Sequence, residues 1–230
     1  MISVVVPTLN EAANLPAFFS SLEKSKFDDY EVVVVDGRSR DDTVSVAERL
    51  GARVVMEKLP GIGRARNAGL KAARGAIVAS ADADAVLCEG WLDRIAWNFE
   101  ARAGLKALSG PSSYGNAKYD IWSFATQWQN NFTPITGFAY LGANNSAYDA
   151  EYLRRTGGWS EDKDEEIDVS LRIFLKRAKV RYDWELRVRL SDRRFGGRGF
   201  LRTVAGWSAN SVAAIAGVRR DLRGYSDWRK

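Results

Sequence analysis

The sequence contains no histidine and a single cysteine, Cys88, in 230 residues. Without histidine, no mechanism can use an imidazole base and no zinc site can use an imidazole ligand. With one cysteine, no disulfide can form within the chain, which favours a cytosolic or cytosol-facing protein. Proton transfer in an active site would therefore depend mainly on carboxylates.

The length and composition are those of an ordinary globular protein. A chain of this length forms one domain of generous size, or one domain with a short appendage. Hydrophobic residues make up 46% and charged residues 27%, which is close to the globular average. The chain runs into a strand-like segment at once, so we expect no signal peptide. No linker separates two independent domains, and we expect one domain over residues 1–190 and an appendage over residues 191–230.

Positive charge is concentrated at the end of the chain. The net charge is +5 and the pI 9.3, but residues 187–230 hold eleven Lys and Arg against three Asp, a net charge of +8. The remaining residues therefore carry a net charge of −3. The basic residues are interleaved with apolar residues instead of base-reading elements, so we expect no nucleic-acid partner. We expect a partner to meet this end of the chain.

Short runs of β-branched residues alternate with helical segments in the first third of the chain. Strands are predicted at residues 2–6, 31–35, 53–56 and 76–81, with helices at residues 14–25, 42–50 and 61–74 between them. Continuous apolar strands that alternate with helices predict an α/β fold with a mostly parallel sheet flanked by helices. Further helices are predicted at residues 89–103 and 165–178, and further strands at residues 107–110, 141–148 and 180–184.

Polar residues follow three of these predicted strands. They are Pro7, Asn10 and Glu11 after the first strand, Asp36 after the second, and Asp82 and Asp84 after the fourth. Ligands bind outside the carboxyl ends of the strands in an open α/β sheet, so these side chains should gather on one rim. A divalent cation or a donor-rich ligand would relieve the repulsion among the carboxylates. Asp82-Ala83-Asp84 is the sharpest candidate for Mg²⁺ or Mn²⁺, whereas helix capping and loop solvation are the alternative interpretation for any single acid.

A glycine-rich segment, residues 61–69, carries Arg64 and Arg66, whose charge and forked donors suit phosphate. The Gly-x-Gly-x-x-Gly pattern of dinucleotide binding fails because Arg66 occupies the third glycine position, and the lysine of a P-loop is missing. We therefore exclude NAD binding and P-loop ATP hydrolysis. A solvated helix with two surface arginines is the alternative interpretation.

An acidic run, residues 161–168, follows Gly157-Gly158-Trp159. Such runs are typical of a solvated helix N-terminus, where the helix dipole favours acids. The glycine-tryptophan turn before the run and Arg172 after it suggest a functional site as well.

Together these segments resemble family 2 glycosyltransferases with the GT-A fold, a Rossmann-like fold of nucleotide-diphospho-sugar transferases. The resemblance covers roughly residues 1–175, in consistent order, and rests on residues 4–11, 31–43, 63–69, 82–84 and 157–172. It implies an inverting, metal-dependent transferase with a nucleotide-sugar donor, GDP-mannose first and a UDP-sugar next. The acceptor would be lipid-linked or a glycolipid at a membrane surface. If the acceptor were a lipid phosphate, it would be ionised already and would need no base.

The resemblance also implies roles in donor binding. Pro7, Asn10 and Glu11 would border the nucleotide, and Asp36 would contact the base. Arg64 or Arg66 would face the base or the diphosphate. Asp84 would coordinate Mg²⁺ or Mn²⁺, and Asp82 would contact the ribose or reach the metal through water. The predicted donor-binding residues are therefore Pro7, Asn10, Glu11, Asp36, Arg64, Arg66, Asp82 and Asp84.

On the acceptor side, the catalytic base of the family aligns with Glu166, while Asp168 and Arg172 align with the later residues of the same motif. Glutamate replaces the usual aspartate, so Glu165 stays open as an alternative base. Gly158, Trp159 and Arg172 would contact the acceptor. A second departure is Gly37, where many members carry an aspartate after Asp36.

Residues 200–218 carry apolar residues close to helical spacing but fall short of a transmembrane span. We predict an amphipathic helix at the cytoplasmic face of the cell membrane, held on anionic lipids by Arg193, Arg194, Arg198 and Trp207. Residues 191–199 also resemble a family subset with a membrane-associated C-terminal helix. The alternative is a helix that packs on the domain or on a second subunit. Three interpretations stay open for four aromatic residues between the predicted strands: they face the same membrane, they line an acceptor groove, or they belong to the core. These residues are Trp122, Phe124, Trp128 and Phe132.

Two other function classes were weighed against the transferase. A sugar nucleotidyltransferase would have a glycine-rich phosphate loop after the first strand, which this sequence lacks. A basic nucleic-acid-binding protein would carry its charge on more than the end of the chain.

Overall fold

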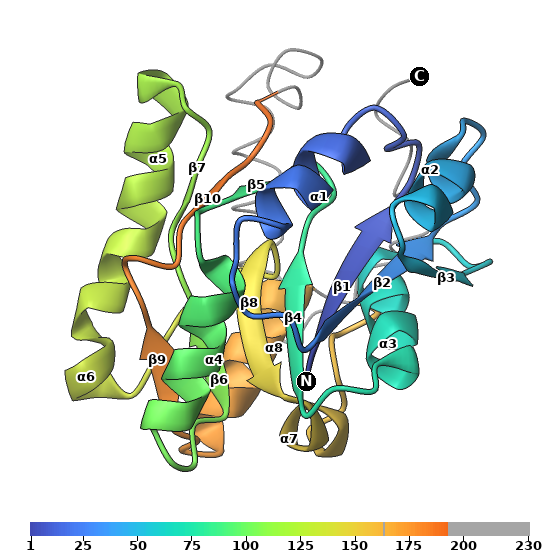
Figure 1. Cartoon of the computed structure of the whole chain (residues 1–230). Coiled ribbons are helices and arrows are strands. Elements are labelled where there is room, and N and C mark those ends of the chain that lie inside the picture. The colour runs from blue at the N-terminus through green and yellow to red at the C-terminus, as the bar shows by residue number, and fades with distance from the viewer. Residues whose placement is uncertain (163, 193–230) are drawn as a thin grey trace.

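The computed structural model describes residues 1–162 and 164–192, which form an α/β fold around one large sheet (Figure 1). The sheet has seven strands in the order β3-β2-β1-β4-β8-β6-β9. Their bounds are β1 Ile2–Thr8, β2 Tyr30–Asp36, β3 Arg53–Met56, β4 Ile77–Ala81, β6 Ala107–Ser109, β8 Asn145–Asp149 and β9 Val180–Tyr182. Neighbouring strands pair in parallel except at β8, which is antiparallel to both β4 and β6.

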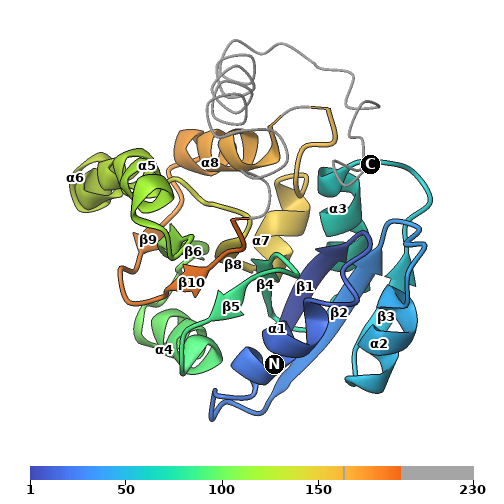
Figure 2. The same ribbon diagram turned by 90° about the horizontal axis from the view of Figure 1, so that it is seen from above.

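Helices cover both faces of this sheet, as the view from above shows (Figure 2). The helices α1 and α4 lie against one face, with α2 beside them. The helices α3, α7 and α8 lie against the other face. Their bounds are α1 Leu15–Leu22, α2 Thr43–Arg49, α3 Ile62–Ala72, α4 Trp91–Ala101, α7 Ala150–Arg155 and α8 Glu165–Leu175.

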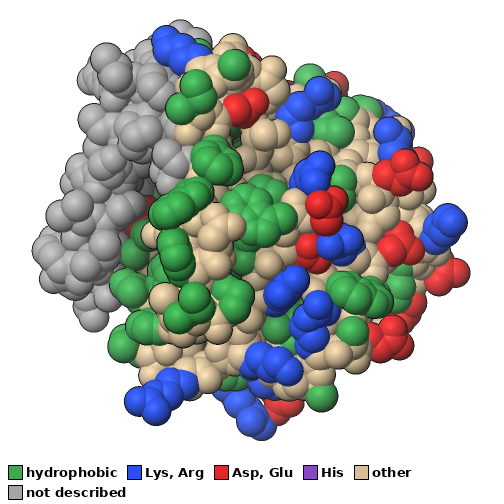
Figure 3. All heavy atoms as spheres, turned by 90° about the vertical axis from the view of Figure 1, so that its left-hand side faces the viewer, with side chains coloured by type: hydrophobic (Ala, Val, Ile, Leu, Met, Phe, Trp, Pro, Cys, Tyr) green, Lys and Arg blue, Asp and Glu red, His purple; other side chains and the backbone are tan. Residues whose placement is uncertain are grey.

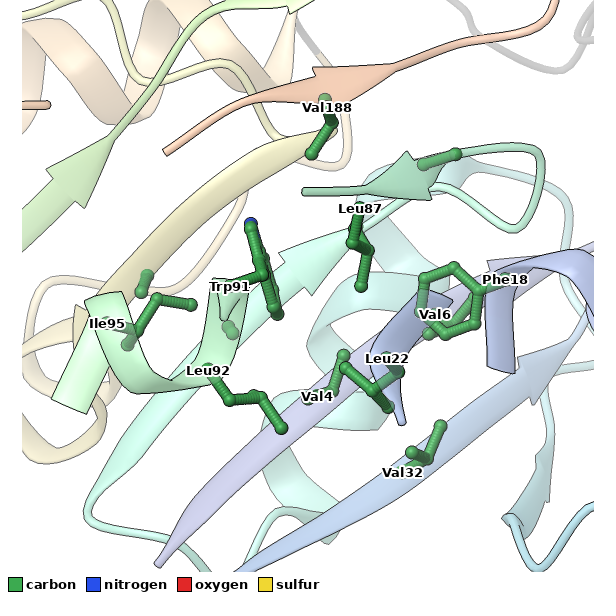
Figure 4. Close-up of a cluster of buried hydrophobic side chains, with 14 of the residues drawn as sticks. Val4, Val6, Phe18, Leu22, Val32, Leu87, Trp91, Leu92, Ile95 and Val188 are labelled. Carbon is green, nitrogen blue, oxygen red and sulfur yellow. The ribbon is translucent and has the colours of Figure 1, made fainter. Parts of the chain in front are cut away.

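The two faces bury two separate hydrophobic cores because successive strand residues point to opposite sides. Val4 and Val6 of β1 point into the first core, with Phe18, Leu22 and Trp91 (Figure 4). Val5 points the other way, into a second core with residues of α3, α7 and α8. Burial on both faces explains why the strands read as continuous valine runs.

A smaller sheet and a helical segment extend the fold beyond β6. The small sheet has the order β5-β10-β7, with β5 Val86–Leu87, β7 Ser112–Ser113 and β10 Val188–Arg189. The helical segment comprises α5 Ala117–Gln127, the 3₁₀ helix η1 Trp128–Phe132 and α6 Thr133–Thr136, at the left of Figure 1. Because β6 ends at the same edge of the large sheet at which β8 begins, the returning strand β8 must run antiparallel.

The predicted α/β class with a mostly parallel sheet is confirmed, and every strand and helix predicted up to residue 184 has a counterpart within a few residues. The membrane segment predicted over residues 191–230 lies outside the described residues except for its first two positions. The same holds for Arg193, Arg194, Arg198 and Trp207. Within the described part of the chain, no helix combines the length and apolar character needed to cross a bilayer.

Candidate active site

The strand register brings the predicted polar residues to one edge of the sheet. Thr8 at the end of β1 pairs with Asp36 at the end of β2, and β4 runs parallel to β1 on its other side. Asp82 and Asp84 directly follow β4. The carboxylates after the second and fourth predicted strands therefore lie on the same rim, which is the upper edge in Figure 1.

Asp36 is completely buried and its carboxylate is fixed by neighbours. It accepts hydrogen bonds from the Thr8 hydroxyl at 3.2 Å and from the Ser39 backbone N–H at 2.8 Å. Asn10 joins the loops after β1 and β2, because its backbone N–H donates to Ser39 Oγ at 2.7 Å and its Oδ1 accepts from the Arg40 N–H at 2.7 Å. The two loops thus form one preorganised wall of the rim.

Glu11 and Pro7 complete this wall. The Glu11 N–H donates to Thr43 Oγ1 at 2.8 Å, and its carboxylate accepts from Asn14 Nδ2 at 2.6 Å. Glu11 therefore connects the first loop to the start of α2 and of α1. Pro7 lies within β1, opposite Val35 of β2.

Arg66 lies at the centre of the site with only 1% of its side chain exposed. Its Nη2 lies 2.9 Å from Asp82 Oδ1, its Nη1 lies 2.7 Å from Glu165 Oε1, and its Nε donates to Ser80 Oγ at 3.2 Å. The guanidinium therefore joins Asp82, which directly follows β4, to Glu165 at the start of α8. Its role in this conformation is to hold two acids in place, which differs from an open fork that awaits phosphate.

Asp82 and Asp84 are the candidate metal ligands. They alternate with the buried residues Ala81, Ala83 and Ala85, and both aspartates are themselves half-buried. Hard carboxylate oxygens suit Mg²⁺ or Mn²⁺. Among residues 1–162 and 164–192, no three His, Cys, Asp or Glu side chains gather closely enough to hold a metal by themselves. The donor set therefore fits a cation that shares its coordination with ligand oxygens and water.

Glu166 lies near the start of α8 and is held by two donors. Its Oε1 accepts from the Ala143 N–H at 2.9 Å, and its Oε2 accepts a short hydrogen bond from the Tyr140 hydroxyl. Burial, with the neighbouring Glu165 and Asp164, raises the pKa of Glu166 to about 7. Burial and the charge of Glu166 raise the pKa of Tyr140 well above its ordinary value, so the Tyr140 hydroxyl stays a donor. A carboxylate with such a pKa can accept a proton near neutral pH.

Glu165 differs from Glu166 in its partner. Burial raises the pKa of Glu165, but the ion pair with Arg66 opposes that rise. A proton on Glu165 would leave the buried guanidinium with one partner fewer, which is costly in a dry environment. Of the two glutamates that the sequence left open, Glu166 is therefore the better placed proton acceptor.

The Gly157-Gly158-Trp159 turn lies between α7 and α8 and packs against α3. Asn67 holds it, because Asn67 Nδ2 donates to the Trp159 carbonyl and Asn67 Oδ1 accepts from the Trp159 N–H, both at 2.8 Å. Gly158 has a φ of +66°, and a Cβ there would lie 2.3 Å from Asn67 Oδ1. Gly63 is required by the same turn, since its Cβ would lie 1.9 Å from the Ser160 carbonyl oxygen. The glycines of the two motifs thus serve the contact between α3 and this turn.

The residues expected to contact the acceptor are engaged inside the protein. Gly158 and Trp159 are buried, and the Trp159 ring packs edge-on against Tyr148. Arg172 donates to the carbonyls of Thr156 and Gly158 and pairs with Asp168 at 2.6 Å. In this conformation these groups are held by contacts within the protein, while 26% of the Arg172 side chain remains exposed, and their contact with an acceptor stays a prediction. Asp168 likewise orients Arg172 through this ion pair.

Arg64 is not joined to the acids of the rim. It lies on α3 and pairs with Glu161 at 3.0 Å, and both side chains are about 40% exposed. Arg64 is therefore the more accessible of the two arginines predicted to face a phosphate.

Sequence reasoning missed Tyr140 and the Ala143 N–H, which both hold Glu166. Tyr140 precedes Glu166 by 26 positions and stands among many aromatic residues. No local motif marks it, because the contact depends on how the segment after α6 returns to the sheet.

A model of the family described as glycosyl transferase family 2 matches residues 3–147. The chain belongs to this family. An uncharacterized glycosyltransferase of Mycobacterium tuberculosis is 41% identical over 104 residues, which are 45% of this chain and 46% of the relative. The chain thus aligns with about half the length of this relative.

Solved structures share the fold of this family 2 chain. The mannosyltransferase PcManGT of Pyrobaculum calidifontis, in complex with GDP-Man and Mn²⁺, superposes with a TM-score of 0.74 and 22% sequence identity. The match covers 96% of this chain and 66% of the PcManGT chain. Glucosyl-3-phosphoglycerate synthase of M. tuberculosis, in complex with Mn²⁺, UDP-glucose and phosphoglyceric acid, has a TM-score of 0.67 and 20% identity, with coverage of 96% and 81%. The predicted GT-A fold is therefore confirmed.

Proposed function

We propose that this chain is an inverting, metal-dependent glycosyltransferase that moves a sugar from a nucleotide-diphosphate donor to a hydroxyl acceptor. One observation carries the proposal: buried Arg66 joins Asp82 of the donor edge to an acidic pair whose second member, Glu166, has a pKa of about 7. A charged donor edge and a proton acceptor are the two requirements of this reaction.

On the donor side, the loops fixed by Asn10 and Asp36 would bind the nucleoside, and Arg64 would face the phosphates. Mg²⁺ or Mn²⁺, held by Asp84 and by Asp82 directly or through water, would neutralise charge on the diphosphate leaving group. GDP-mannose is the first donor to test and UDP-sugars are next. PcManGT, with GDP-Man, and glucosyl-3-phosphoglycerate synthase, with UDP-glucose, share the fold and support this choice.

On the acceptor side, Glu166 would accept the proton of the acceptor hydroxyl as the oxygen forms its bond to the anomeric carbon. The bond from that carbon to the diphosphate breaks on the opposite face, so the configuration inverts. Tyr140 and the Ala143 N–H keep Glu166 oriented, while the charge of Arg66 favours the carboxylate form of Glu165. We propose a lipid-linked or glycolipid acceptor at the cytoplasmic face of a membrane, reached with the help of the basic end of the chain.

A thermal-shift panel of GDP-, UDP- and dTDP-sugars with and without Mn²⁺ tests the donor side. The cognate donor should raise the melting temperature only when the metal is present. The Asp84→Asn variant should lose this metal-dependent rise. If it binds and turns over the donor as the parent does, the assignment of the metal ligands is wrong.

The base is tested by Glu166→Gln, with Glu165→Gln as the matched neighbour. Glu166→Gln should lower the transfer rate to a hydroxyl acceptor by at least about 10²-fold and leave donor binding unchanged. Glu165→Gln should mainly lower stability, because it removes a partner of Arg66. Normal transfer by Glu166→Gln would point to Glu165 as the base or to a phosphate acceptor.

A further inference from the structure

The segment formed by α5, η1 and α6 carries its large apolar residues on the outside. Ile121 is 72% exposed and Ile135 is 84% exposed. Three aromatic residues between them are also exposed, at steps of three to four positions: Phe124, Trp128 and Phe132. Such steps place side chains on one face of a helix. We call these five residues the apolar stripe, and Figure 3 shows hydrophobic side chains gathered on this side of the molecule.

The same segment turns several polar residues inward, which is the reverse of an ordinary surface helix. Ser123, Gln127 and Asn130 are buried. Ser123 Oγ donates to the Ser112 carbonyl at 2.6 Å, and Gln127 Nε2 donates to the same carbonyl at 3.0 Å. Asn130 Oδ1 accepts from the Tyr140 N–H at 2.8 Å. Because polar partners fix the segment from within, its apolar stripe is left to meet an apolar environment outside.

The segment that carries the stripe also lacks charged residues. Residues 121–138 contain no Asp, Glu, Lys or Arg. Charged residues that would keep an exposed helix in water are therefore missing from the stripe. A contiguous apolar surface of this kind marks an interaction site.

A basic border adjoins the stripe. The Phe138 ring lies edge-on to the Phe174 ring, with the ring centroids 5.7 Å apart. This contact joins the chain just after α6 to the end of α8. Phe174 and Leu175 are exposed, and the four basic residues that follow are exposed too: Lys176, Arg177, Lys179 and Arg181. Residues 169–182 contain no Asp or Glu. The described surface around the stripe thus combines apolar side chains with a border of positive charge.

This combination favours one occupant over two others. Residues 193–230 contain nine Lys and Arg against two Asp, so the basic border would repel that part of the chain. A second copy on a twofold axis would bring the same border against itself. An anionic lipid surface offers both an apolar interior for the stripe and negative headgroups for the border.

We infer that the apolar stripe and its basic border form a membrane-docking face that inserts Phe124, Trp128 and Ile135 among anionic lipids. The inference rests on the proposed function, because a lipid-linked acceptor must reach the base. The chain runs from the stripe through Phe138 directly to Tyr140, which holds Glu166. Docking at the stripe would therefore bring the acceptor side of the site to the lipid surface.

Flotation of the full chain with vesicles tests this inference. The vesicles are phosphatidylcholine alone, or phosphatidylcholine mixed with phosphatidylglycerol. Trp128→Ser should lower binding to the mixed vesicles by about tenfold, since an interfacial tryptophan contributes buried apolar area. Trp97→Ser is the matched control, because Trp97 on α4 is 51% exposed and Trp128 is 50% exposed. This control should bind as the parent does.

Two further variants separate the parts of the face. Phe124→Ser combined with Ile135→Ser should reduce binding at least as strongly as Trp128→Ser. Arg177→Glu combined with Arg181→Glu should remove the preference for phosphatidylglycerol. Each variant should keep the parent melting temperature and donor-induced thermal shift, which reports on the proposed function separately. Parent-like flotation by Trp128→Ser overturns the inference, and so does a parent dimer in gel filtration that Trp128→Ser dissociates.

Discussion

At the scale of single residues, neighbours decide what each carboxylate of the site can do. Glu165 and Glu166 are adjacent in the chain and identical in type. One is paired with a buried guanidinium, and the other accepts from a tyrosine hydroxyl and a backbone N–H. The first pairing fixes a charge in place, whereas the second leaves the carboxylate able to take up a proton near neutral pH.

Tyr140→Phe should shift the pH dependence of transfer. The hydrogen bond from the Tyr140 hydroxyl favours the ionised form of Glu166. A hydrogen bond to a charged group contributes roughly 1.5–3 kcal/mol. The proposed base, Glu166, would have to be ionised to act, so the rate should rise with pH through about 7 in the parent. In Tyr140→Phe the midpoint of that rise should move up by about one to two pH units.

The measurement is the pH profile of kcat/KM with a hydroxyl acceptor. Tyr119→Phe serves as the control, because Tyr119 lies outside the site on α5. A lower rate at every pH with the midpoint unmoved would mean that Tyr140 only supports the fold.

Arg66→Met should destabilise the protein far more than Arg64→Met. Removal of Arg66 leaves Asp82 and Glu165, each only 16% exposed, without their shared cation. Breaking a buried pair in this way costs roughly 3–5 kcal/mol. The ion pair of Arg64 is well exposed and should contribute under about 1 kcal/mol. Urea unfolding of both variants measures the difference, and equal losses would contradict the structure.

The sequence predicted which carboxylates would follow the strands, because parallel strands end at one edge. It could not predict that Arg66 binds Glu165, which is 99 positions away. Nor could it predict that Trp159 and Arg172 turn inward. Those outcomes depend on tertiary packing, and neither charge nor spacing in the chain encodes them.

At the scale of elements, hydrophobic pattern and turn residues were sufficient for β1 to β4 and their helices. The strand Arg53–Met56 was predicted with its observed ends. The sequence did not predict the separate helices from α5 to α6, because large apolar residues of this segment are exposed while Ser123, Gln127 and Asn130 are buried. Helix prediction from hydrophobic periodicity assumes that the apolar face is buried, so it fails for such a segment.

Gly69 of α3 sets the distance between this helix and the sheet. A Cβ at Gly69 would lie 2.3 Å from Val5 Cγ1. Gly69→Ala should therefore force α3 away from β1 and lower the free energy of unfolding by about 1–3 kcal/mol. Lys71→Ala, at an exposed position of the same helix, should change it by less than about 0.5 kcal/mol. Chemical denaturation checks both values, and a neutral Gly69→Ala would show that α3 packs less closely.

At the scale of the whole molecule, the acidic start of α8 should make stability depend on pH. Burial raises the pKa of Asp164, Glu165 and Glu166. An acid with a raised pKa in the folded state stabilises that state below its unfolded pKa, and this contribution is lost as pH rises through the folded pKa. For Glu166 the window runs from 4.5 to about 7.

The free energy of unfolding should therefore fall between pH 5 and pH 7, by up to about 3 kcal/mol for Glu166. Acids with lowered pKa values, such as Asp149 and Asp183, act in the opposite direction but at more acidic pH. Melting temperature against pH, without donor or metal, is the measurement. Glu166→Gln should flatten the curve, and a parent whose stability rises across this window would contradict the burial of these acids.

The two ion pairs of Arg66 constrain how the sequence of this chain can evolve. One guanidinium depends on an acid that follows β4 and on another that begins α8, and the second lies beyond the segment matched by the family model. A replacement of the later segment by that of a relative would be tolerated only if it brought an acid to position 165. Changes in the later segment can therefore accumulate around this cation, but only along routes that preserve its counter-charges.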